Sequence, residues 1–283
     1  MTPSDSINIE EILELAAVRA DDRVETRALL ESAPSAEVEA ALAVLRSRLG
    51  NFGEKPPSSA GGQLVWMSAL LRFLPEQLSW YRDRGIPEEV IRATVADIGR
   101  HIAISRVTTG FFGLETWRWL TEHATGTLYQ LGRLQFQIQP GPEGIADLAS
   151  NEAVLGIHIP EEEGRPLSPA AVEDSLARAV PFFAEFFPRQ PVRLANCVSW
   201  LLDPYLLETL PPQSNIAQFA SRFTLYGELL DTPSDAVYFT FRRRDVQNIA
   251  ALPRDTALQR TVLGRIENGG SWQVGQGYLQ LSF

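Results

Sequence analysis

The sequence predicts an α/β (mixed α+β) protein in two parts: a helical N-terminal domain over residues 1–124 and a mixed β-sheet flanked by helices over residues 125–283. In the first part, apolar residues recur at helical spacing and strand-like alternation is nearly absent. From residue 126 the apolar spacing changes to a period of two. The order that follows is strand, strand, helix, strand, short helices and hairpin. A helix between two consecutive strands implies that these strands are parallel.

The helical part is expected to contain several helices separated by turns. Residues 51–62 are rich in glycine, proline and serine, which is typical of a loop. Residues 63–84 after this loop are expected to form one or two helices, interrupted near Pro75, whereas Pro87 fits the first turn of the most amphipathic helix. The stretches with helical spacing are residues 9–16, 35–49, 63–84, 87–102 and 115–123.

The second part is expected to carry the sheet. Alternation and short apolar runs predict strands at residues 126–138, 153–159, 191–202, 224–230, 236–241 and 277–283. Helices are expected at residues 170–187, 203–210, 215–223 and 255–266. The turn DTPSD, residues 231–235, would join two of the strands into a hairpin. Ligands bind a sheet of this kind beyond the carboxyl ends of its parallel strands, here 153–159 and 191–202.

Composition excludes several classes of protein. The chain has 25 basic and 35 acidic residues, a net charge of −10, so no nucleic-acid partner is expected. A single cysteine, Cys197, excludes a disulfide framework and a cysteine-rich zinc site. The three histidines lack metal-ligand spacing, so no metal is expected. The first residues do not resemble a signal peptide and no apolar run is long enough to span a membrane, which predicts a cytoplasmic protein without a membrane partner.

Five segments within residues 97–272 carry a recognisable pattern: DIGRHIAISR (97–106), WLTEHATGTLYQLGRLQFQ (119–137), LGIHIPEEEGRPLSPAAVEDSLARA (155–179), CVSWLLDPYLLETLPPQSNIAQFASRF (197–223) and LPRDTALQRTVLGRIENGGSW (252–272). They resemble a bacterial family of GNAT-like N-acyltransferases with a helical N-terminal domain. The resemblance implies a V-shaped cleft for an acyl thioester between the family's fourth and fifth strands. It also implies acyl-CoA (coenzyme A) as cosubstrate, a small-molecule or peptide amine as acceptor, and no tightly bound cofactor. Acetyl-CoA, as in an N-acetyltransferase, a longer acyl-CoA and an acyl carrier protein are all possible donors.

Two departures from the wider superfamily bear on function. Its pyrophosphate loop, Gln or Arg followed by two residues, Gly, one residue and Gly or Ala, has no counterpart between Ile159 and Ser175. Many relatives carry a tyrosine general acid where this chain has Gln218. Both departures favour a non-catalytic ligand-binding or regulatory module as an alternative function.

His158 is the strongest candidate for a catalytic residue. By strand alternation it shares a face with Val154 and Gly156, opposite Ile157 and Ile159. An imidazole changes charge near neutral pH and suits the removal of a proton from an attacking amine. The resemblance implies that the backbone of Ile157 and Ile159 contacts the donor and polarises its carbonyl. A structural histidine, hydrogen-bonded to backbone, is the alternative interpretation.

Cys197 and Tyr205 are further candidates for chemistry. Cys197 alternates with Ala195 and Ser199 on its strand, and with His158 as its base it would support a thiol-dependent acyl transferase or hydrolase. A small buried side chain is the alternative. Tyr205 begins a short helix after that strand, which Asp203 is expected to cap, and is a substitute general acid.

Arg165 and Ser168 precede the helix that joins the two parallel strands. Ser168 followed by proline is typical of an N-cap. Arg165 would lie at the same helix N-terminus, where free N–H groups favour a phosphate of the donor. Arg242, Arg243 and Arg244 form either a solvated charged turn or a docking point for an adenosine phosphate or an acidic carrier protein.

These observations predict an acyltransferase in which an amine attacks the thioester directly. The helical domain would cover the acceptor side of the cleft. The alternatives are the non-catalytic module and the Cys197/His158 enzyme. The sequence leaves the acceptor, the acyl length and the oligomeric state open.

Overall fold

A computed structural model describes residues 7–51, 61–146, 148–149, 152–244 and 248–281. The chain forms two compact units, Met1–Leu131 with Gln135–Gln139 and Gly132–Leu134 with Pro140–Phe283. Residues 132–134 belong to the second unit and residues 135–139 to the first, so the chain passes between the units more than once. The domain boundary between residues 124 and 125 stays a prediction.

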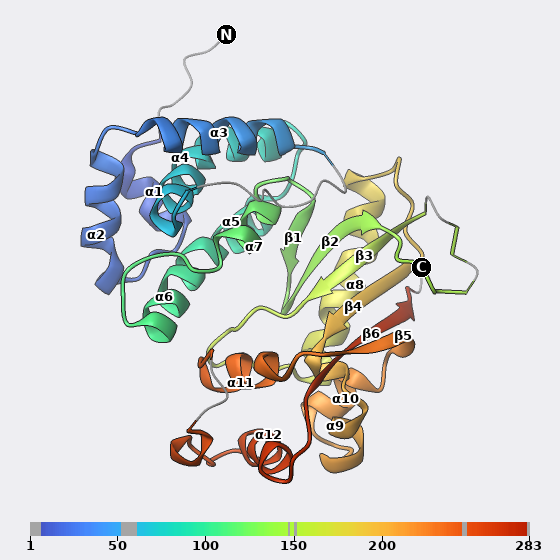
Figure 1. Ribbon diagram of the computed structural model, residues 1–283. Helices are drawn as coiled ribbons and strands as arrows, with labels where there is room; N and C mark the ends of the chain where they lie inside the picture. The colour runs from blue at the N-terminus through green and yellow to red at the C-terminus, as the bar shows by residue number, and fades with distance from the viewer. Residues whose placement is uncertain (1–6, 52–60, 147, 150–151, 245–247, 282–283) are drawn as a thin grey trace. The chain divides into compact units, whose positions relative to one another are not determined.

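The helices of the first unit lie within residues 9–123, as predicted, and the strand residues that the unit also contains begin at residue 128 (Figure 1). Asn8 and Ser35 cap the helices that begin at Ile9 and Ala36 through their side chains. The helices are α1 (Ile9–Leu15), α2 (Ala20–Glu31), α3 (Ala36–Arg48), α4 (Gln63–Arg82), α5 (Glu88–Val95), α6 (Asp97–Thr109) and α7 (Trp117–His123).

Two expectations for these helices need correction. Pro75 lies inside α4, which continues through it as one helix instead of being interrupted. The amphipathic stretch 87–102 is two helices, because the N–H of Gly99 donates to the carbonyl of Ala16 at 2.9 Å instead of continuing one helical ladder. A Cβ on Gly99 would lie 2.4 Å from that carbonyl oxygen, so only glycine allows this approach.

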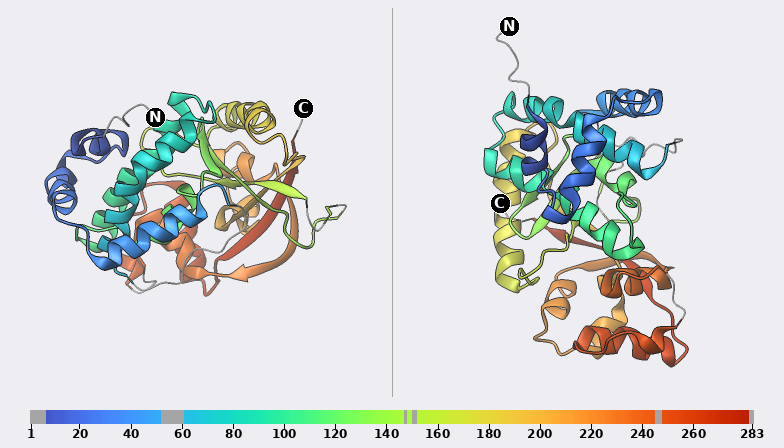
Figure 2. Two further views of the ribbon diagram at one scale, coloured as in Figure 1. Left: turned by 90° about the horizontal axis from the view of Figure 1, so that it is seen from above. Right: turned by 90° about the vertical axis from the view of Figure 1, so that its left-hand side faces the viewer.

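The strands form one mixed six-stranded sheet, which confirms the predicted fold class. Their order is β1-β2-β3-β4-β6-β5. β3 and β4 are parallel, whereas β6 pairs antiparallel with both β4 and β5. Figure 2 shows β5 and β6 running side by side. The strands are β1 (Leu128–Leu131), β2 (Leu134–Pro140), β3 (Ala153–His158), β4 (Leu194–Ser199), β5 (Thr224–Asp231) and β6 (Gln273–Gln280).

Helices connect and flank these strands. α8 (Pro169–Phe186) links β3 to β4, so the predicted parallel pair with a helical crossover is confirmed. The remaining helical segments are η1 (Trp200–Leu202), α9 (Pro204–Thr209), α10 (Asn215–Ala220), α11 (Pro233–Phe241), η2 (Ile249–Ala251) and α12 (Ala257–Glu267).

Two predicted strands differ from the structure. The expected strand 126–138 is two strands, β1 and β2, because Gly132 adopts φ +70° and turns the chain. The expected strand 236–241 lies in the helix α11, so the predicted hairpin does not form. Pro233 starts this helix, and Ala236 and Val237 are buried on it against a cluster of tryptophans.

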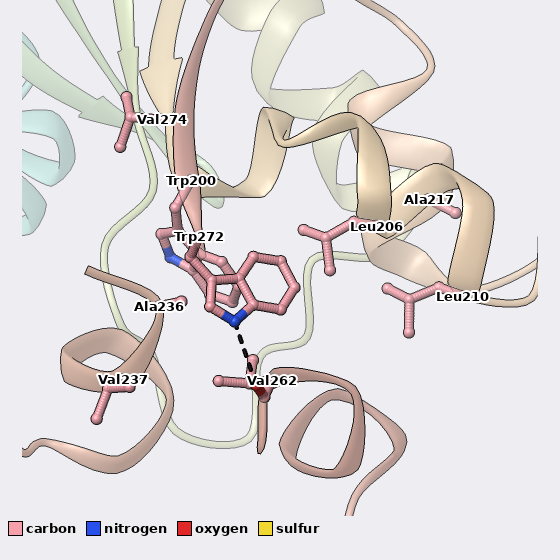
Figure 3. Packing of buried hydrophobic residues seen from close by; sticks show 9 residues of the cluster. All are labelled: Trp200, Leu206, Leu210, Ala217, Ala236, Val237, Val262, Trp272 and Val274. Carbon is pink, nitrogen blue, oxygen red and sulfur yellow. Dashed lines mark hydrogen bonds between the residues drawn. The ribbon is translucent and has the colours of Figure 1, made fainter. Parts of the chain in front are cut away.

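That cluster, called the tryptophan cluster below, is a separate small hydrophobic core (Figure 3). Its buried residues are Trp200, Leu206, Leu210, Ala217, Ala236, Val237, Val262, Trp272 and Val274. The indole of Trp272 meets Trp200 edge-on with 5.7 Å between ring centroids, and its N–H donates to the carbonyl of Val262 at 3.2 Å. Both tryptophans are buried. The cluster therefore packs α9, α11 and α12 against the N-terminal end of β6.

The first unit contains a buried group of titratable residues centred on Asp97. Its carboxylate lies 2.9 Å from Nε2 of His123 and 3.5 Å from Nε2 of His101, and it pairs with Arg100. Nδ1 of His101 contacts the hydroxyl of Thr116 at 2.7 Å. Burial alone would raise the pKa of Asp97, but the two histidines outweigh it and hold the pKa well below its usual range.

Acid is therefore expected to destabilise the protein through Asp97. A carboxyl with a depressed pKa in the folded state stabilises the fold above its unfolded pKa of about 4 and loses that contribution as the pH falls further. We expect the free energy of unfolding of the wild-type protein to decline below roughly pH 4, and that of Asp97→Asn to decline less steeply there. Urea unfolding of both proteins between neutral and acid pH measures this, and parallel pH profiles would contradict it.

Among the described residues, no helix is both long and apolar enough to cross a membrane.

Candidate active site

The parallel strands β3 and β4 pair only over a short stretch. Gly156 lies opposite Asn196, and this is the last pair that the two described strands form. β3 nevertheless continues to His158, and β4 continues to Ser199, which pairs with Gly275 of β6 on its other side. The two strands therefore part at their carboxyl ends, which is where sheets of this kind bind ligands.

His158 is the last residue of β3 and is half-buried. It shares a face with Gly156, and because Gly156 lies opposite Asn196, this face also carries Asn196 and Val198. Val198 is 52% exposed, so the face is open at the end where the strands part. At the other end, Ile145 packs over the beginning of both strands.

Two tyrosines accompany Asn196 on the same face. Tyr278 lies opposite Asn196 in the ladder, and the hydroxyl of Tyr226 donates to its side-chain oxygen at 2.8 Å. Burial raises the pKa of Tyr226, against a smaller opposing effect of the bond to Asn196, so its hydroxyl keeps its proton at neutral pH. Neither tyrosine stands in a sequence pattern that marks it as a site residue. Only the register between β4, β5 and β6 shows that they face the same way as His158.

Cys197 faces the opposite side of the sheet. It lies across from Gly277, where a Cβ would lie 2.8 Å from the side chain of Phe223 and 3.0 Å from that of Leu202. Cys197 is 1% exposed, and burial raises its pKa to about 12. A thiolate is therefore strongly disfavoured, and His158 lies on the other face of the sheet. The geometry gives no support to the Cys197/His158 enzyme and favours a packing role for the thiol.

Replacing Cys197 by alanine is accordingly expected to leave acyl transfer nearly unchanged. The smaller side chain should lower the free energy of unfolding by about 1 kcal/mol through lost packing. Intact-mass measurement after exposure to an acyl-CoA should show no adduct on the wild-type protein. An acyl adduct, or loss of turnover in the variant, would restore the thiol mechanism.

The loop between β3 and α8 carries the other predicted binding residues. Ser168 caps α8 by accepting the N–H of Ala171 at 3.3 Å, which confirms the predicted cap. Arg165 is half-exposed and pairs with Glu162 at 2.8 Å. Glu161 pairs with Arg242 at the end of α11. Two of the three loop glutamates thus have guanidinium partners.

Arg133 lies beneath this loop and was not identified from the sequence. It follows Gly132 in the turn between β1 and β2 and is 7% exposed. Its guanidinium donates to the carbonyl of Pro160 and to the carbonyl of Arg165, both at 2.7 Å. The glycine before it marks the turn, and that is the only sequence signal for this position.

Tyr205 belongs to the tryptophan cluster of the second unit. Its backbone N–H is capped by Asp203 at 2.9 Å, as predicted. Its ring lies against the guanidinium of Arg265, 4.4 Å away, and meets Trp272 edge-on at 5.8 Å. These contacts give the ring a packing role, and its role as a general acid stays a prediction.

No group of three or more histidine, cysteine, aspartate or glutamate side chains within the described ranges could hold a metal ion. The arrangement instead brings together a histidine at a strand end, polar groups on one open sheet face, and a loop leading into a capped helix N-terminus. A helix N-terminus favours an anion, and a half-buried imidazole at a strand end can move a proton.

Comparison with known proteins decides the family. Residues 7–126 match the N-acyltransferase N-terminal domain, and residues 128–279 match the GNAT-like C-terminal domain. The chain belongs to the GNAT-like N-acyltransferases. The resemblance seen in the sequence is thereby confirmed, and the protein is an acyltransferase enzyme. Among curated proteins, no sequence matches the chain.

Solved structures of acyltransferases resemble this GNAT-like N-acyltransferase over its whole length. An acyltransferase in complex with decanoyl-CoA and teicoplanin is 30% identical with a TM-score of 0.85, covering 99% of this chain and 91% of that one. An acyltransferase mutant in complex with octanoyl-CoA is 29% identical, with the same coverage and TM-score. An acyltransferase in complex with CoA and 10C-teicoplanin is 30% identical with a TM-score of 0.84, also over 99% of this chain and 91% of that one.

Proposed function

We propose that this enzyme transfers an acyl group from acyl-CoA to an amine, with His158 as the general base. The observation that carries the proposal is the parting of β3 and β4 beyond Gly156 and Asn196, with His158 at the open end. The similar acyltransferases bound to CoA or acyl-CoA support the choice of donor.

The reaction would proceed by direct attack. His158, directly or through a water molecule, takes a proton from the ammonium group, and the free amine nitrogen then forms a bond to the thioester carbonyl carbon. Backbone groups of Ile157 and Ile159 would contact the donor, and an N–H there would stabilise the oxyanion. The C–S bond then breaks, and the CoA thiolate leaves and takes up a proton. Tyr205 stays a candidate for that proton donor, although its ring packs against Arg265 and Trp272.

A longer acyl-CoA is favoured over acetyl-CoA as the donor. The similar acyltransferases hold octanoyl-CoA and decanoyl-CoA, and two of them hold teicoplanin or its 10C form. We therefore infer an amine on a glycopeptide or a molecule of similar size as the acceptor. Arg165 and Ser168 would lie beside the phosphates of the donor, at the N-terminus of α8. A bacterial, cytoplasmic setting completes the proposal.

Incubation of the protein with acetyl-, octanoyl- and decanoyl-CoA and a panel of amines that includes glycopeptides tests this function. The expected result is an acylated amine and free CoA, with octanoyl- or decanoyl-CoA the better donor. Release of free thiol without an acylated amine would indicate hydrolysis and contradict the proposal. Binding of acyl-CoA without any product would favour the non-catalytic module. If product forms only when an acylated carrier protein is supplied in place of acyl-CoA, the carrier protein is the donor.

A further inference from the structure

The buried guanidinium of Arg133 holds both ends of the loop between β3 and α8. It donates to the carbonyl of Pro160, where the strand has just ended, and to that of Arg165, three residues before the cap Ser168. The backbone N–H of Arg133 donates to the hydroxyl of Ser175 at 2.8 Å. One residue therefore ties the loop to the first turns of α8.

The turn that carries Arg133 is itself seated on α8. A Cβ on Gly132 would lie 2.8 Å from the hydroxyl oxygen of Ser175, so the backbone of the turn approaches the helix closely. The same hydroxyl donates to the carbonyl of Ala171 at 2.8 Å, within the first turns of α8. The position of the guanidinium relative to the helix is thus fixed by backbone and side-chain bonds.

Burying a guanidinium is costly unless its donors find acceptors, and here the Nε and Nη1 groups of Arg133 each make a charge-assisted bond to a carbonyl. An arginine can bond two acceptors in different directions because its donors form a rigid planar fork, whereas lysine presents a single ammonium. The arrangement also places a positive charge below a loop that contains three glutamates, two of which pair with Arg165 and Arg242. This charge favours an anion at the adjacent helix N-terminus.

We propose that Arg133 is a positioning residue for the phosphate-bearing part of the donor. By holding the carbonyls of Pro160 and Arg165, it fixes the loop so that its N–H groups and the first turn of α8 face the donor's diphosphate. This chain has no glycine-rich phosphate loop between Ile159 and Ser175. Instead, the bonds of Arg133 fix the shape of the loop between β3 and α8. The proposal rests on the proposed function, because it assigns the phosphates of acyl-CoA to this loop.

Two donors with the same acyl-pantetheine arm, one with and one without the phosphate-bearing nucleotide, separate this role from a general structural one. Decanoyl-CoA carries the nucleotide and its phosphates, whereas decanoyl-pantetheine ends before them. For Arg133→Met we expect KM for decanoyl-CoA to rise about tenfold or more, because two charge-assisted bonds that shape the loop are lost. KM for decanoyl-pantetheine and kcat with either donor should stay close to the wild-type values.

Arg133→Lys is the second variant, since it keeps the charge and lowers the risk of misfolding. It should show the same selective defect in milder form, because a compact ammonium does not reproduce the planar fork that reaches both carbonyls. Arg265→Lys is the matched control: Arg265 is also an arginine bound at short distance, 2.7 Å from Asp203, but it lies in the tryptophan cluster. Its effect should be the same for both donors.

The outcomes are distinct. An equal rise in KM for both donors in the Arg133 variants would show a general structural role and overturn the proposal. An unchanged KM for decanoyl-CoA in a folded Arg133→Met protein would also overturn it. A wild-type protein that acylates no amine from either donor would instead refute the proposed function itself.

Discussion

Replacing His158 by alanine is expected to lower kcat/KM for acyl transfer by about 10²- to 10⁴-fold at neutral pH, the usual contribution of a positioned general base. The reason is that an alkylammonium acceptor must lose a proton before its nitrogen can attack the thioester. His158 lies at the end of β3 on the open sheet face, where it can take that proton. Steady-state rates with decanoyl-CoA and the best amine measure the effect.

The pH dependence distinguishes a base from a residue that only shapes the site. As the pH rises towards the pKa of the acceptor amine, the free amine becomes abundant and the defect of His158→Ala should shrink. His158→Gln, which keeps a polar side chain but cannot act as a base, should behave like the alanine variant. A defect of constant size across the pH range would assign His158 a structural role.

Replacing Asp203 by alanine is expected to lower the free energy of unfolding by about 3–5 kcal/mol, as found when one partner of a buried ion pair is removed. Asp203 is 1% exposed and binds three groups at once. It caps α9 at the N–H of Tyr205, pairs with Arg265 at 2.7 Å, and accepts the N–H of Gln273 at 2.9 Å. The variant would leave the guanidinium without its carboxylate.

Urea unfolding measures this change, with Asp174→Ala as the matched control. Asp174 also pairs with an arginine, Arg178 at 2.8 Å, but both side chains are more than half exposed. Its loss should cost less than about 1 kcal/mol, because solvent screens such pairs. Similar destabilisation by the two substitutions would contradict the structural role given to Asp203.

Periodicity predicted much of the fold because each signal was local. The helical first part, the parallel strands with the crossover helix and the caps at Ser168 and Asp203 all follow from neighbouring residues. The run 236–241 was misread because its aromatic and β-branched residues favour a strand by propensity. Burial of Ala236 and Val237 against the tryptophan cluster overrides that propensity and stabilises a helix.

The candidate site was less accessible from the sequence, because its members meet only through register. Alternation shows which residues of the same strand share a face with His158 or with Cys197, but it does not relate the faces of the two strands. The pairing of Gly156 with Asn196 then shows that these two faces are opposite. Arg133 was missed for a related reason: a turn residue acquires its role only when the chain brings it beneath the loop after β3.

The structure therefore gives the two parallel strands different neighbours on their two faces. One face is closed by Leu202 and Phe223 over Gly277, the ladder partner of Cys197, whereas the other opens towards Val198 beside His158. Direct transfer needs the open face, where an amine can approach a thioester. A covalent thiol mechanism would need the closed one.

A crystal structure of the protein with bound CoA shows where the donor binds. We expect the pantetheine arm to lie where β3 and β4 part, alongside Ile157 and His158, with the diphosphate at the start of α8. An arm bound elsewhere, with the two strands hydrogen-bonded to each other as far as His158 and Ser199, would contradict this expectation.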